Sequence, residues 1–283
     1  MPEITVIMPV YQMAADPALR AAVRSIKQQS CQDWEMLLYD DGSSDGTLHE
    51  LKKLADEDPN ISVIRGKKNR GAGYARNRCI RASKGRYVAL MDADDLSHPG
   101  RLKLQADFLD RHPEYAFVGS SAWMIDNRGV WGLRKVEQRP CREAFLNTMP
   151  FIHPSMMFRK EVLEKLHGYA DNKKNQRAED YELLMRLYAA GYLGYNIQKP
   201  LLAYREDPAA YKKRKYRYRI RECGVRLEGF RKLGILRGHL RYVVKPLAVG
   251  IIPAYCMRKV RMQRFQVRHN TDVPEWLSKV GRD

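Results

Sequence analysis

Short apolar runs alternate with helical patterns over the first 113 residues, and this alternation limits the possible folds more than any other feature. The β-rich runs cover 4–10, 34–40, 61–65 and 86–92, and the helical patterns between them cover 16–30, 45–58 and 73–84. Strands that alternate with helices of this length are typical of right-handed β-α-β units. The sequence therefore predicts an α/β fold with a mainly parallel, Rossmann-like sheet flanked by helices.

The alternation loosens after residue 113 but does not stop. Two further runs, 115–125 and 129–136, are β-rich, and the pattern of 153–169 indicates a strand followed by a helix. The segment 178–192 places apolar residues at helical spacing. We therefore expect one α/β domain over residues 1–210, followed by a region of a different kind.

The positive charge of the chain is concentrated in residues 211–283. The whole sequence carries a net charge of +18, and this C-terminal region holds 20 Lys and Arg against 5 Asp and Glu. Apolar residues recur there at spacings of four and three, with basic residues between them, which predicts a basic amphipathic helix. These apolar residues are Tyr216, Ile220, Cys223, Leu227 and Phe230.

Two arrangements of this C-terminal region are open. The apolar stripe could pack on the preceding domain, or the helix could lie on an anionic membrane surface. Both can hold together, with 211–235 docked on the protein and 240–265 touching lipid. The apolar run 246–257 contains two prolines and is shorter than the ~18 residues of a membrane span. We expect it to dip into the interface of the membrane.

The cysteines and the N-terminus bear on the compartment. Five cysteines are scattered with no CxxC pair, so neither a disulfide framework nor a zinc site is expected. The N-terminal residues lack the basic start and long apolar run of a secretion signal. These features favour a cytoplasmic protein.

Three carboxylates follow the fourth β-rich run directly. They are Asp92, Asp94 and Asp95. Residues two apart in an extended strand face the same way, so Asp92 and Asp94 are expected on one side. Two hard oxygen ligands side by side suit Mg²⁺ or Mn²⁺, whose coordination substrate phosphates often complete. A second interpretation is that Asp95 or Ser97 caps the helix that follows.

A second acidic pair, Asp40 and Asp41, ends the second β-rich run. A carboxylate there could accept hydrogen bonds from a base or a ribose. The alternative is a tight turn, with Asp45 as the cap of the next helix. Ligands of parallel α/β sheets bind outside the carboxyl ends of the strands, so we expect this pair to lie near the 92–95 carboxylates.

Four segments together resemble the large inverting glycosyltransferase family called family 2, which has the GT-A nucleotide-sugar fold. The segments are ITVIMPVYQ, SIKQQSCQDWEMLLYDDGSSDGT, NRGAGYARNRCIRASKGRYVALMDADD and AEDYELLMRL. They fall within residues 3–205 in the order and spacing of the family. The Gln-x-x-Arg-Trp signature of processive synthases is absent from the sequence, which favours the addition of single sugars.

The resemblance implies a donor site for a nucleoside-diphosphate sugar, most commonly a UDP-sugar, with Mn²⁺ or Mg²⁺ as the cofactor. In the family, the loop after the first strand and the second acidic residue after the second strand hold the base. The residues implied here are Pro9, Tyr11 and Asp41 for the base, Arg76 and Asn77 beside the nucleotide, Asp92 at the ribose and Asp94 on the metal.

The resemblance also implies a catalytic base at the start of the helix predicted over 178–192. Asp180 would remove the proton of the attacking hydroxyl, and Glu179 would help to recognise the acceptor. Taken alone, both residues could instead be favourable charges in the first turn of a helix. His153 would lie on the acceptor side, although a core histidine is an equally good interpretation.

One departure from the family pattern concerns the metal. Many relatives place a histidine two residues after a Tyr-Arg pair, whereas this chain has Asp207 in that place, after Tyr204 and Arg205. Asp207 would then replace the histidine as a metal ligand, or Arg205 would bind the diphosphate directly.

The leading expectation is a metal-dependent glycosyltransferase of the hexosyltransferase class, peripheral on the inner face of a bacterial cell membrane. Its partners would be a nucleotide-sugar donor, a glycan or lipid-linked acceptor and an anionic membrane surface. A nucleic-acid-binding protein is the alternative, because basic and aromatic residues interleave in 211–221. The acidic strand ends would repel nucleic acid, so no such partner is expected. The complete set of carboxylates disfavours a catalytically inactive sugar-nucleotide binding module.

Overall fold

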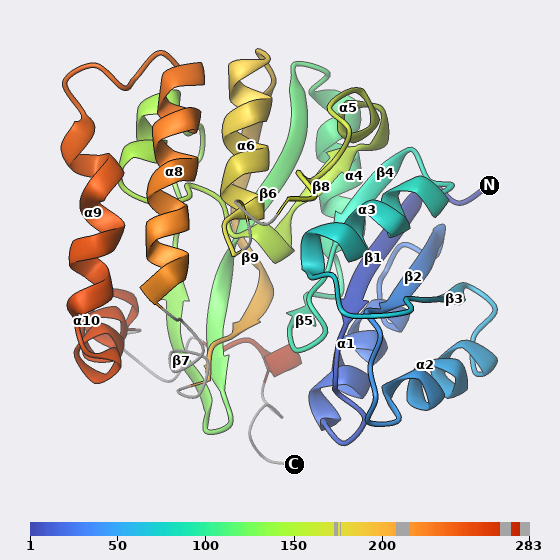
Figure 1. Ribbon diagram of the computed structural model, residues 1–283. Helices are drawn as coiled ribbons and strands as arrows, with labels where there is room; N and C mark the ends of the chain where they lie inside the picture. The colour runs from blue at the N-terminus through green and yellow to red at the C-terminus, as the bar shows by residue number, and fades with distance from the viewer. Residues whose placement is uncertain (173–174, 176, 208–215, 267–272, 278–283) are drawn as a thin grey trace.

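The computed structural model describes residues 1–172, 175, 177–207, 216–266 and 273–277 (Figure 1). Its first half contains β1 (Ile4–Val10), α1 (Pro17–Lys27), β2 (Trp34–Asp40), α2 (Thr47–Asp56), β3 (Ile61–Arg65), α3 (Ala72–Ala82), β4 (Tyr87–Leu90), β5 (Leu96–Ser97) and α4 (Arg101–Arg111). Its second half contains β6 (Tyr115–Asp126), β7 (Gly129–Arg134), η1 (Arg142–Leu146), η2 (His153–Ser155), β8 (Met157–Arg159), α5 (Lys160–Lys165), α6 (Glu179–Ala189), β9 (Leu193–Arg205), α8 (Tyr216–Lys232), α9 (Leu240–Ile251), α10 (Ala254–Phe265) and η4 (Glu275–Leu277).

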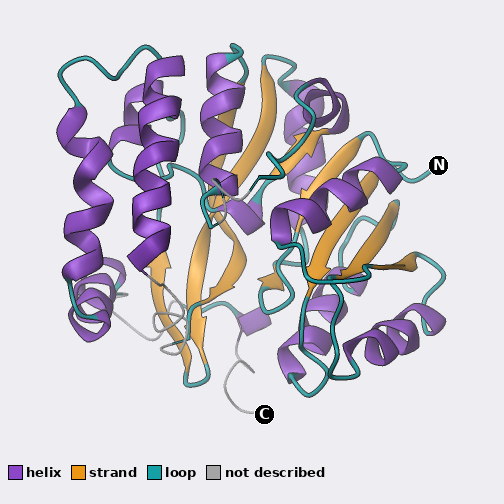
Figure 2. Ribbon diagram, in the orientation of Figure 1, coloured by secondary structure: helices purple, strands orange, loops and turns teal. Residues whose placement is uncertain are grey.

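Within these residues, nine strands form one mixed sheet in the order β3-β2-β1-β4-β8-β6-β9-β5, with β7 paired to β6 (Figure 2). The strands β3, β2, β1 and β4 are parallel to one another. The strand β8 enters antiparallel between β4 and β6, and β9 then runs parallel to β6. The predicted α/β fold with its N-terminal parallel sheet is confirmed.

Helices cover both faces of the sheet, so both faces bury apolar side chains. Along β1, Val6 and Met8 belong to a hydrophobic cluster that includes residues of α1, α2 and α4. Ile7 belongs to a second cluster, which includes residues of α3, α6 and α8. This alternation follows from the two-residue period of a strand. Burial on both faces is the physical reason that β1 and β2 read as continuous apolar runs.

The acidic turn after β4 departs from the sequence-based prediction in two ways. The strand ends at Leu90, so residues 92–95 form a turn and do not continue the strand. The next helix, α4, begins at Arg101 without any side-chain cap. The interpretation of Asp95 or Ser97 as helix caps is therefore wrong, and both side chains are available for other contacts.

The start of α2 also differs from the prediction. Its N-cap position is Gly46, which adopts φ 89°, a left-handed conformation that glycine tolerates. Asp45 lies one residue before the N-cap position but still caps the first turn, because its Oδ1 accepts hydrogen bonds from the N–H and the hydroxyl of Thr47, the first residue of the helix, at 3.1 and 2.6 Å. Its Oδ2 accepts from the N–H of Ala14 at 3.2 Å. Asp45 therefore ties the turn after β2 to the loop after β1.

The helix α8 packs on α6 as part of the same core as the sheet (Figure 1). Its buried residues are Val225, Arg226, Gly229 and Phe230. Of the stripe predicted from the sequence, Phe230 is buried, but Tyr216, Ile220 and Leu227 are 46%, 59% and 46% exposed. The predicted stripe is therefore wrong at these three exposed residues, whereas Cys223 is partly buried against the core. The packed face includes an arginine and a glycine, which a hydrophobicity pattern does not mark.

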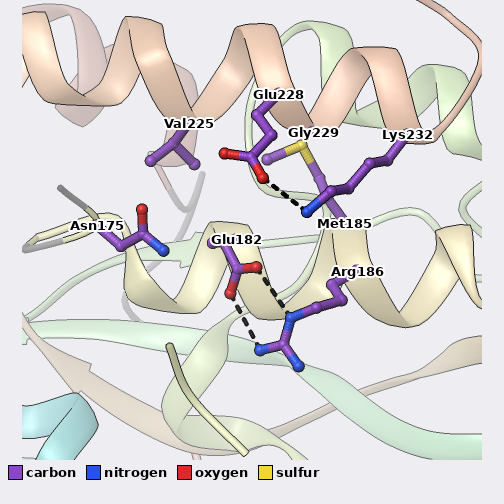
Figure 3. Close-up of a pocket in the computed structure, with 8 residues that line it drawn as sticks. All are labelled: Asn175, Glu182, Met185, Arg186, Val225, Glu228, Gly229 and Lys232. Carbon is purple, nitrogen blue, oxygen red and sulfur yellow. Dashed lines mark hydrogen bonds and ion pairs between the residues drawn. The ribbon is translucent and has the colours of Figure 1, made fainter. Parts of the chain in front are cut away.

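A small hollow lies between α6 and α8 (Figure 3). Its lining residues are Asn175, Glu182, Met185, Arg186, Val225, Glu228, Gly229 and Lys232. Glu182 pairs with Arg186 at 2.9 Å on α6, and Glu228 pairs with Lys232 at 2.7 Å on α8. The charges in the hollow are therefore balanced within each helix, and the hollow belongs to the helix–helix interface.

The helix α9 packs beside α8, and α10 lies against β7 (Figure 1). Large apolar side chains are exposed along these two helices and the turn between them: Leu240, Val244, Ile251, Ile252, Tyr255, Val260 and Met262. None of the helices in the described part of the chain is long and apolar enough to cross a membrane by itself. Only one pair of helices, Leu240–Ile251 and Tyr255–Phe265, is together long and apolar enough to span a membrane in this described part, and the two helices are bent by 114° where they meet.

Candidate functional site

The carboxyl ends of β1, β2 and β4 meet at one edge of the sheet. The parallel register pairs Val10 with Asp40, and it pairs Ile7 with Leu90. The N–H of Asp41 donates to the carbonyl of Val10 at 2.9 Å. The loops after these strands therefore lie side by side, as the sequence predicts for the acidic residues 40–41 and 92–95.

The residues implied for the base differ in exposure. Tyr11 follows β1 and is 44% exposed, Pro9 is partly buried, and Asp41 is 3% exposed. The Asp41 carboxylate accepts hydrogen bonds from the N–H groups of Arg70 and Gly71 at 2.9 and 2.7 Å. Burial raises the pKa of Asp41. Asp41 therefore fastens the loop before α3 to the end of β2, and its contact with a base stays a prediction.

Arg76 on α3 contacts the acidic turn after β4. Its Nη2 donates to Oδ1 of Asp92 at 2.7 Å, and the residue is 6% exposed. Burial lowers the pKa of Arg76, but the charges of Asp92 and Glu179 and the hydrogen bond to Asp92 act against burial, and the pKa is raised above its ordinary value. Arg76 is therefore a fixed positive charge between the turn after β4 and the start of α6.

Asp94 and Asp95 lie in the crowded part of the turn. Burial, followed by the charge of Asp92, raises the pKa of Asp94 to about 6. Burial and both neighbouring carboxylates raise the pKa of Asp95 well above its ordinary value. The N–H of Arg205, at the end of β9, donates to Oδ1 of Asp95 at 2.7 Å, and its Nε donates to the carbonyl of Asp94 at 3.1 Å. Arg205 therefore holds the turn from the side of β9.

The oxygen atoms of this turn fit a divalent cation. Burial, and after it repulsion from Asp92, raises the pKa of Asp94, and a bound cation would favour the ionised carboxylate against both effects. Among the described residues, Oδ2 of Asp95 and Oδ1 of Asp207, two residues beyond Arg205, are buried and have no hydrogen-bond partner. In the described part of the chain, no three His, Cys, Asp or Glu side chains gather into a closed metal site. Carboxylates with open positions suit Mg²⁺ or Mn²⁺ that also binds phosphate.

Glu179 and Asp180 occupy the first turn of α6, as the sequence predicts. Oδ1 of Asp180 accepts a hydrogen bond from the N–H of Tyr181 at 2.8 Å. Burial, followed by the charge of Glu179, raises the pKa of Asp180 to about 6. Oε2 of Glu179 is buried without a hydrogen-bond partner in the described residues. At neutral pH, Asp180 is thus ionised and is a stronger base than an ordinary aspartate.

His153 and Tyr169 form a buried pair, of which sequence patterns indicate only the histidine. Nε2 of His153 lies 2.9 Å from the hydroxyl of Tyr169. Burial, reinforced by the charge of Arg76, lowers the pKa of His153 well below its ordinary value. The Asn77 side chain donates to the carbonyl of Tyr169 at 2.7 Å and accepts from its N–H at 2.8 Å. Asn77 and His153 therefore both hydrogen-bond to Tyr169, a residue that belongs to none of the motifs identified in the sequence.

These contacts bring together charged residues of four segments that are far apart in the sequence: α3, the turn after β4, the start of α6 and the end of β9. Arg76 lies between Asp92 and the start of α6, and its guanidinium is 5.7 Å from the centroid of the Tyr169 ring. One part of the arrangement offers carboxylates to a cation. The other offers a basic carboxylate to a hydroxyl. The site can hold an anionic leaving group and deprotonate a nucleophile.

The fold is that of known GT-A enzymes. The TarS 1–349 structure from S. aureus in complex with UDP matches with a TM-score of 0.66 at 19% identity, over 92% of this chain and 78% of that chain. This chain covers 43% of the longer TarS structure. The mannosyltransferase PcManGT from Pyrobaculum calidifontis, in complex with GDP-Man and Mn²⁺, matches with a TM-score of 0.59 at 19% identity, over 93% and 80% of the two chains. The architecture therefore defines the class as a GT-A transferase fold.

Sequence comparisons identify the family. The model of Glycosyl transferase family 2 matches residues 5–167, and that of Glycosyl transferase family group 2 matches residues 87–260. EpsE of Bacillus subtilis (strain 168), which is named as a glycosyltransferase, is 34% identical over 264 residues, covering 93% of this chain and 94% of EpsE. The chain belongs to glycosyltransferase family 2 and is a glycosyltransferase.

Proposed function

We propose that this enzyme transfers one sugar from a nucleoside-diphosphate sugar to a hydroxyl of a glycan or lipid-linked glycan, with inversion at the anomeric carbon. A UDP-sugar is the donor we favour. One observation carries the proposal: Arg76 pairs with Asp92 in the acidic turn and also attracts Asp180 at the start of α6, so that Asp94 and Asp180, two carboxyl groups whose pKa is raised to about 6, belong to separate segments of one site. One is suited to the leaving diphosphate with its cation, and the other to the attacking hydroxyl.

The donor end uses Asp92, Asp94 and Asp207. A divalent cation, when bound, neutralises the negative charge that develops on the departing diphosphate. Asp94 would be its main protein ligand, and the unpartnered Oδ1 of Asp207 makes that residue the second candidate. Asp92, oriented by Arg76, would contact the ribose side of the nucleotide. TarS in complex with UDP and PcManGT in complex with GDP-Man and Mn²⁺ share this fold, which supports a nucleotide-sugar donor and a divalent cation here.

The acceptor end uses Asp180 as the general base. A sugar hydroxyl is a poor nucleophile, and a positioned carboxylate that takes its proton contributes typically 10²–10⁴-fold to the rate. One carboxylate opposite the leaving group gives a single displacement, which inverts the anomeric carbon and needs no covalent nucleophile. Glu179 and the Tyr169–His153 pair would bound the acceptor side.

The exposed apolar side chains of α9 and α10 support a location on the inner face of the cell membrane. Tyr255, Val260 and Met262 project from a helix whose other residues include four Lys and Arg and no Asp or Glu. A face that combines apolar and basic side chains suits an anionic lipid surface. An acceptor carried on a lipid would then be presented to the enzyme in the plane of the membrane.

Binding of a nucleotide-sugar panel tests the proposed function. The purified protein is scanned for melting temperature with each nucleotide sugar, in Mn²⁺ and in EDTA, and nucleotide release is measured in parallel. We expect a UDP-sugar to raise the melting temperature in Mn²⁺ and much less in EDTA, because ligands stabilise the state that binds them. Equal shifts in Mn²⁺ and EDTA for every nucleotide sugar would refute the role of the cation.

A further inference from the structure

Two ion pairs attach α10 to the strands beside the acidic turn. Nη2 of Arg258 lies 2.8 Å from Oδ2 of Asp126, and Nη1 of Arg261 lies 3.1 Å from Oε1 of Glu206. Each carboxylate side chain is only 5% exposed, whereas the arginines are about a quarter exposed, at 26% and 21%. We call these two pairs the α10 clamp. Loss of an arginine removes the ion-pair partner of a buried carboxylate, although Glu206 keeps the attraction of the nearby Arg134, so each pair constrains where its segments lie.

The carboxylates of the clamp belong to the segments that hold the acidic turn. Glu206 stands between Arg205, which bonds to Asp95 and to the carbonyl of Asp94, and Asp207. Asp126 is followed by Asn127, whose Oδ1 accepts from Nη1 of Arg205 at 2.9 Å. One ion pair therefore holds Glu206, which follows Arg205 in the chain, and the other holds Asp126, which precedes Asn127, a hydrogen-bond partner of Arg205. The clamp and the acidic turn are linked through this one arginine.

Close packing fixes the helix against the sheet as well. A Cβ added to Gly132 on β7 would lie 2.7 Å from the carbonyl oxygen of Phe265, the last residue of α10, so only glycine allows this approach. The rings of Trp131 and Phe265 lie 6.5 Å apart between centroids. The clamp is therefore part of a formed interface and not a pair of surface contacts.

We propose that Arg261 and Glu206 are positioning residues for the donor. Their ion pair holds residues 205–207 so that the oxygens of Asp94 and Asp207 keep the spacing that a divalent cation and a diphosphate require. Neither residue touches the reacting atoms; both act through Arg205 and Asp207. This inference rests on the proposed function of the site.

Metal-dependent binding of UDP tests the clamp. Affinity is measured by isothermal titration calorimetry with UDP as the probe, in Mn²⁺ and in EDTA, together with the melting temperature. We expect Arg261→Met to weaken UDP binding in Mn²⁺ by about tenfold and in EDTA by less than about twofold, since the affected groups serve the cation. Arg261→Lys should recover most of the affinity. Arg264→Met is the matched control, because it removes one exposed charge from the same helix.

Glu206→Gln alone keeps the proposal testable if Arg261→Met proves unstable, because it should weaken Mn²⁺-dependent UDP binding in the same way; a double-mutant cycle adds to the test when both single variants fold. Glu206→Gln preserves size and removes the charge, and the double variant should bind UDP no worse than the weaker single variant, as for two residues that act as a unit. Additive losses would overturn the clamp. Wild-type-like binding by Arg261→Met, or equal losses in Arg261→Met and Arg264→Met, would also overturn it. If the wild type shows no Mn²⁺-dependent binding of UDP, the proposed function fails instead.

Discussion

At the scale of single residues, Asp94 and Asp180 share a raised pKa of about 6 but differ in their neighbours. Burial and the charge of Asp92 in the same turn raise the pKa of Asp94, so a bound cation would readily restore the ionised form. Burial and the charge of Glu179 raise the pKa of Asp180, and Oδ1 of Asp180 accepts a hydrogen bond from a backbone N–H. The first environment is that of a metal ligand, and the second is that of a base.

Substitution should separate the two roles. We expect Asp94→Ala and Asp180→Asn each to reduce transfer by at least ~10³-fold, as is usual when a charge-stabilising group or a base is removed. Asp94→Ala should also weaken Mn²⁺-dependent UDP binding, whereas Asp180→Asn should leave that binding within about twofold of the wild type. Turnover and UDP titrations check both variants. Equal loss of binding in the two would remove the assignment of separate roles.

The pH dependence of transfer follows from the pKa of Asp180. A general base acts only when it is deprotonated, so the rate at saturating donor and Mn²⁺ should fall as the pH drops through about 6. Saturating Mn²⁺ keeps Asp94 ionised and isolates the titration of Asp180. The measurement is the initial rate between pH 5 and pH 8. A rate that rises as the pH is lowered over this range is incompatible with Asp180 as the base.

The same group predicts an effect on stability. Its folded pKa is about 6 against the ordinary 3.8, so the folded state binds the proton more tightly, and this stabilisation is lost as the pH rises through about 6. Asp180→Asn should therefore raise the free energy of unfolding at pH 7.5, by up to about 3 kcal/mol, and change it little near pH 3.5. Urea denaturation at the two pH values checks this. An equal gain at both values would mean that charge burial is not the cause.

At the scale of elements, the helix α8 shows how a pattern can be right in kind and wrong in detail. The spacing predicts an amphipathic helix, and a helix forms over Tyr216–Lys232. Its packed face is set by Arg226, whose Nη1 reaches the carbonyl of Leu146 at 3.0 Å, and by Gly229, which admits Met185. The exposed Ile220 and Leu227 then remain outside the core.

Two substitutions on α8 test which face is packed. Phe230→Ala should lower the free energy of unfolding by about 3–5 kcal/mol, because Phe230 is fully buried. Leu227→Ala, three residues away and 46% exposed, should lower it by less than about 1 kcal/mol. Urea denaturation compares them. Similar losses of unfolding free energy in the two variants would instead support the stripe predicted from the sequence, with Leu227 packed.

The boundary expected at residue 210 is accordingly one of composition more than of packing. Val225 and Phe230 of α8 and Val243 of α9 belong to the same hydrophobic cluster as Ile7 and Leu37 of the sheet. We expect a chain that ends at residue 210 to expose this cluster and aggregate, since exposed contiguous apolar surface promotes association. Soluble, monomeric behaviour of the shortened chain in size-exclusion chromatography would show instead that 1–210 folds independently.

At the scale of the whole molecule, the helix proposed to touch lipid also carries the α10 clamp. Tyr255→Ser, Val260→Ser and Met262→Ser together should reduce sedimentation with anionic vesicles severalfold, because each removes exposed apolar area that contact with lipid would bury, at roughly 25 cal/mol per Å². Ile220→Ser, which alters an exposed apolar residue of α8, is the control. Vesicle binding unchanged by the triple substitution would remove α10 as the lipid surface. Salt-sensitive retention on DNA would favour the nucleic-acid alternative.

Much of the donor edge could be predicted from the sequence because its signals are local. The apolar run before Asp92 and the parallel alternation place that carboxylate at a strand end, beside the loop of Asp41. The roles of Asn77 and His153 could not be predicted in this way. Both converge on Tyr169, which lies in a loop and is 92 residues from Asn77. Only packing shows that contact.

The sequence by itself determined the strands β1 to β4 with the helices between them, their parallel direction and the acidic residues that follow β2 and β4. These features depend on residue periodicity and on turn chemistry over a few neighbouring positions. Only the tertiary structure decided that Arg205 holds Asp95, 110 residues earlier, and that Arg258 binds Asp126 across 132 residues. Such contacts depend on how distant segments pack, and a local pattern carries no record of its distant partner.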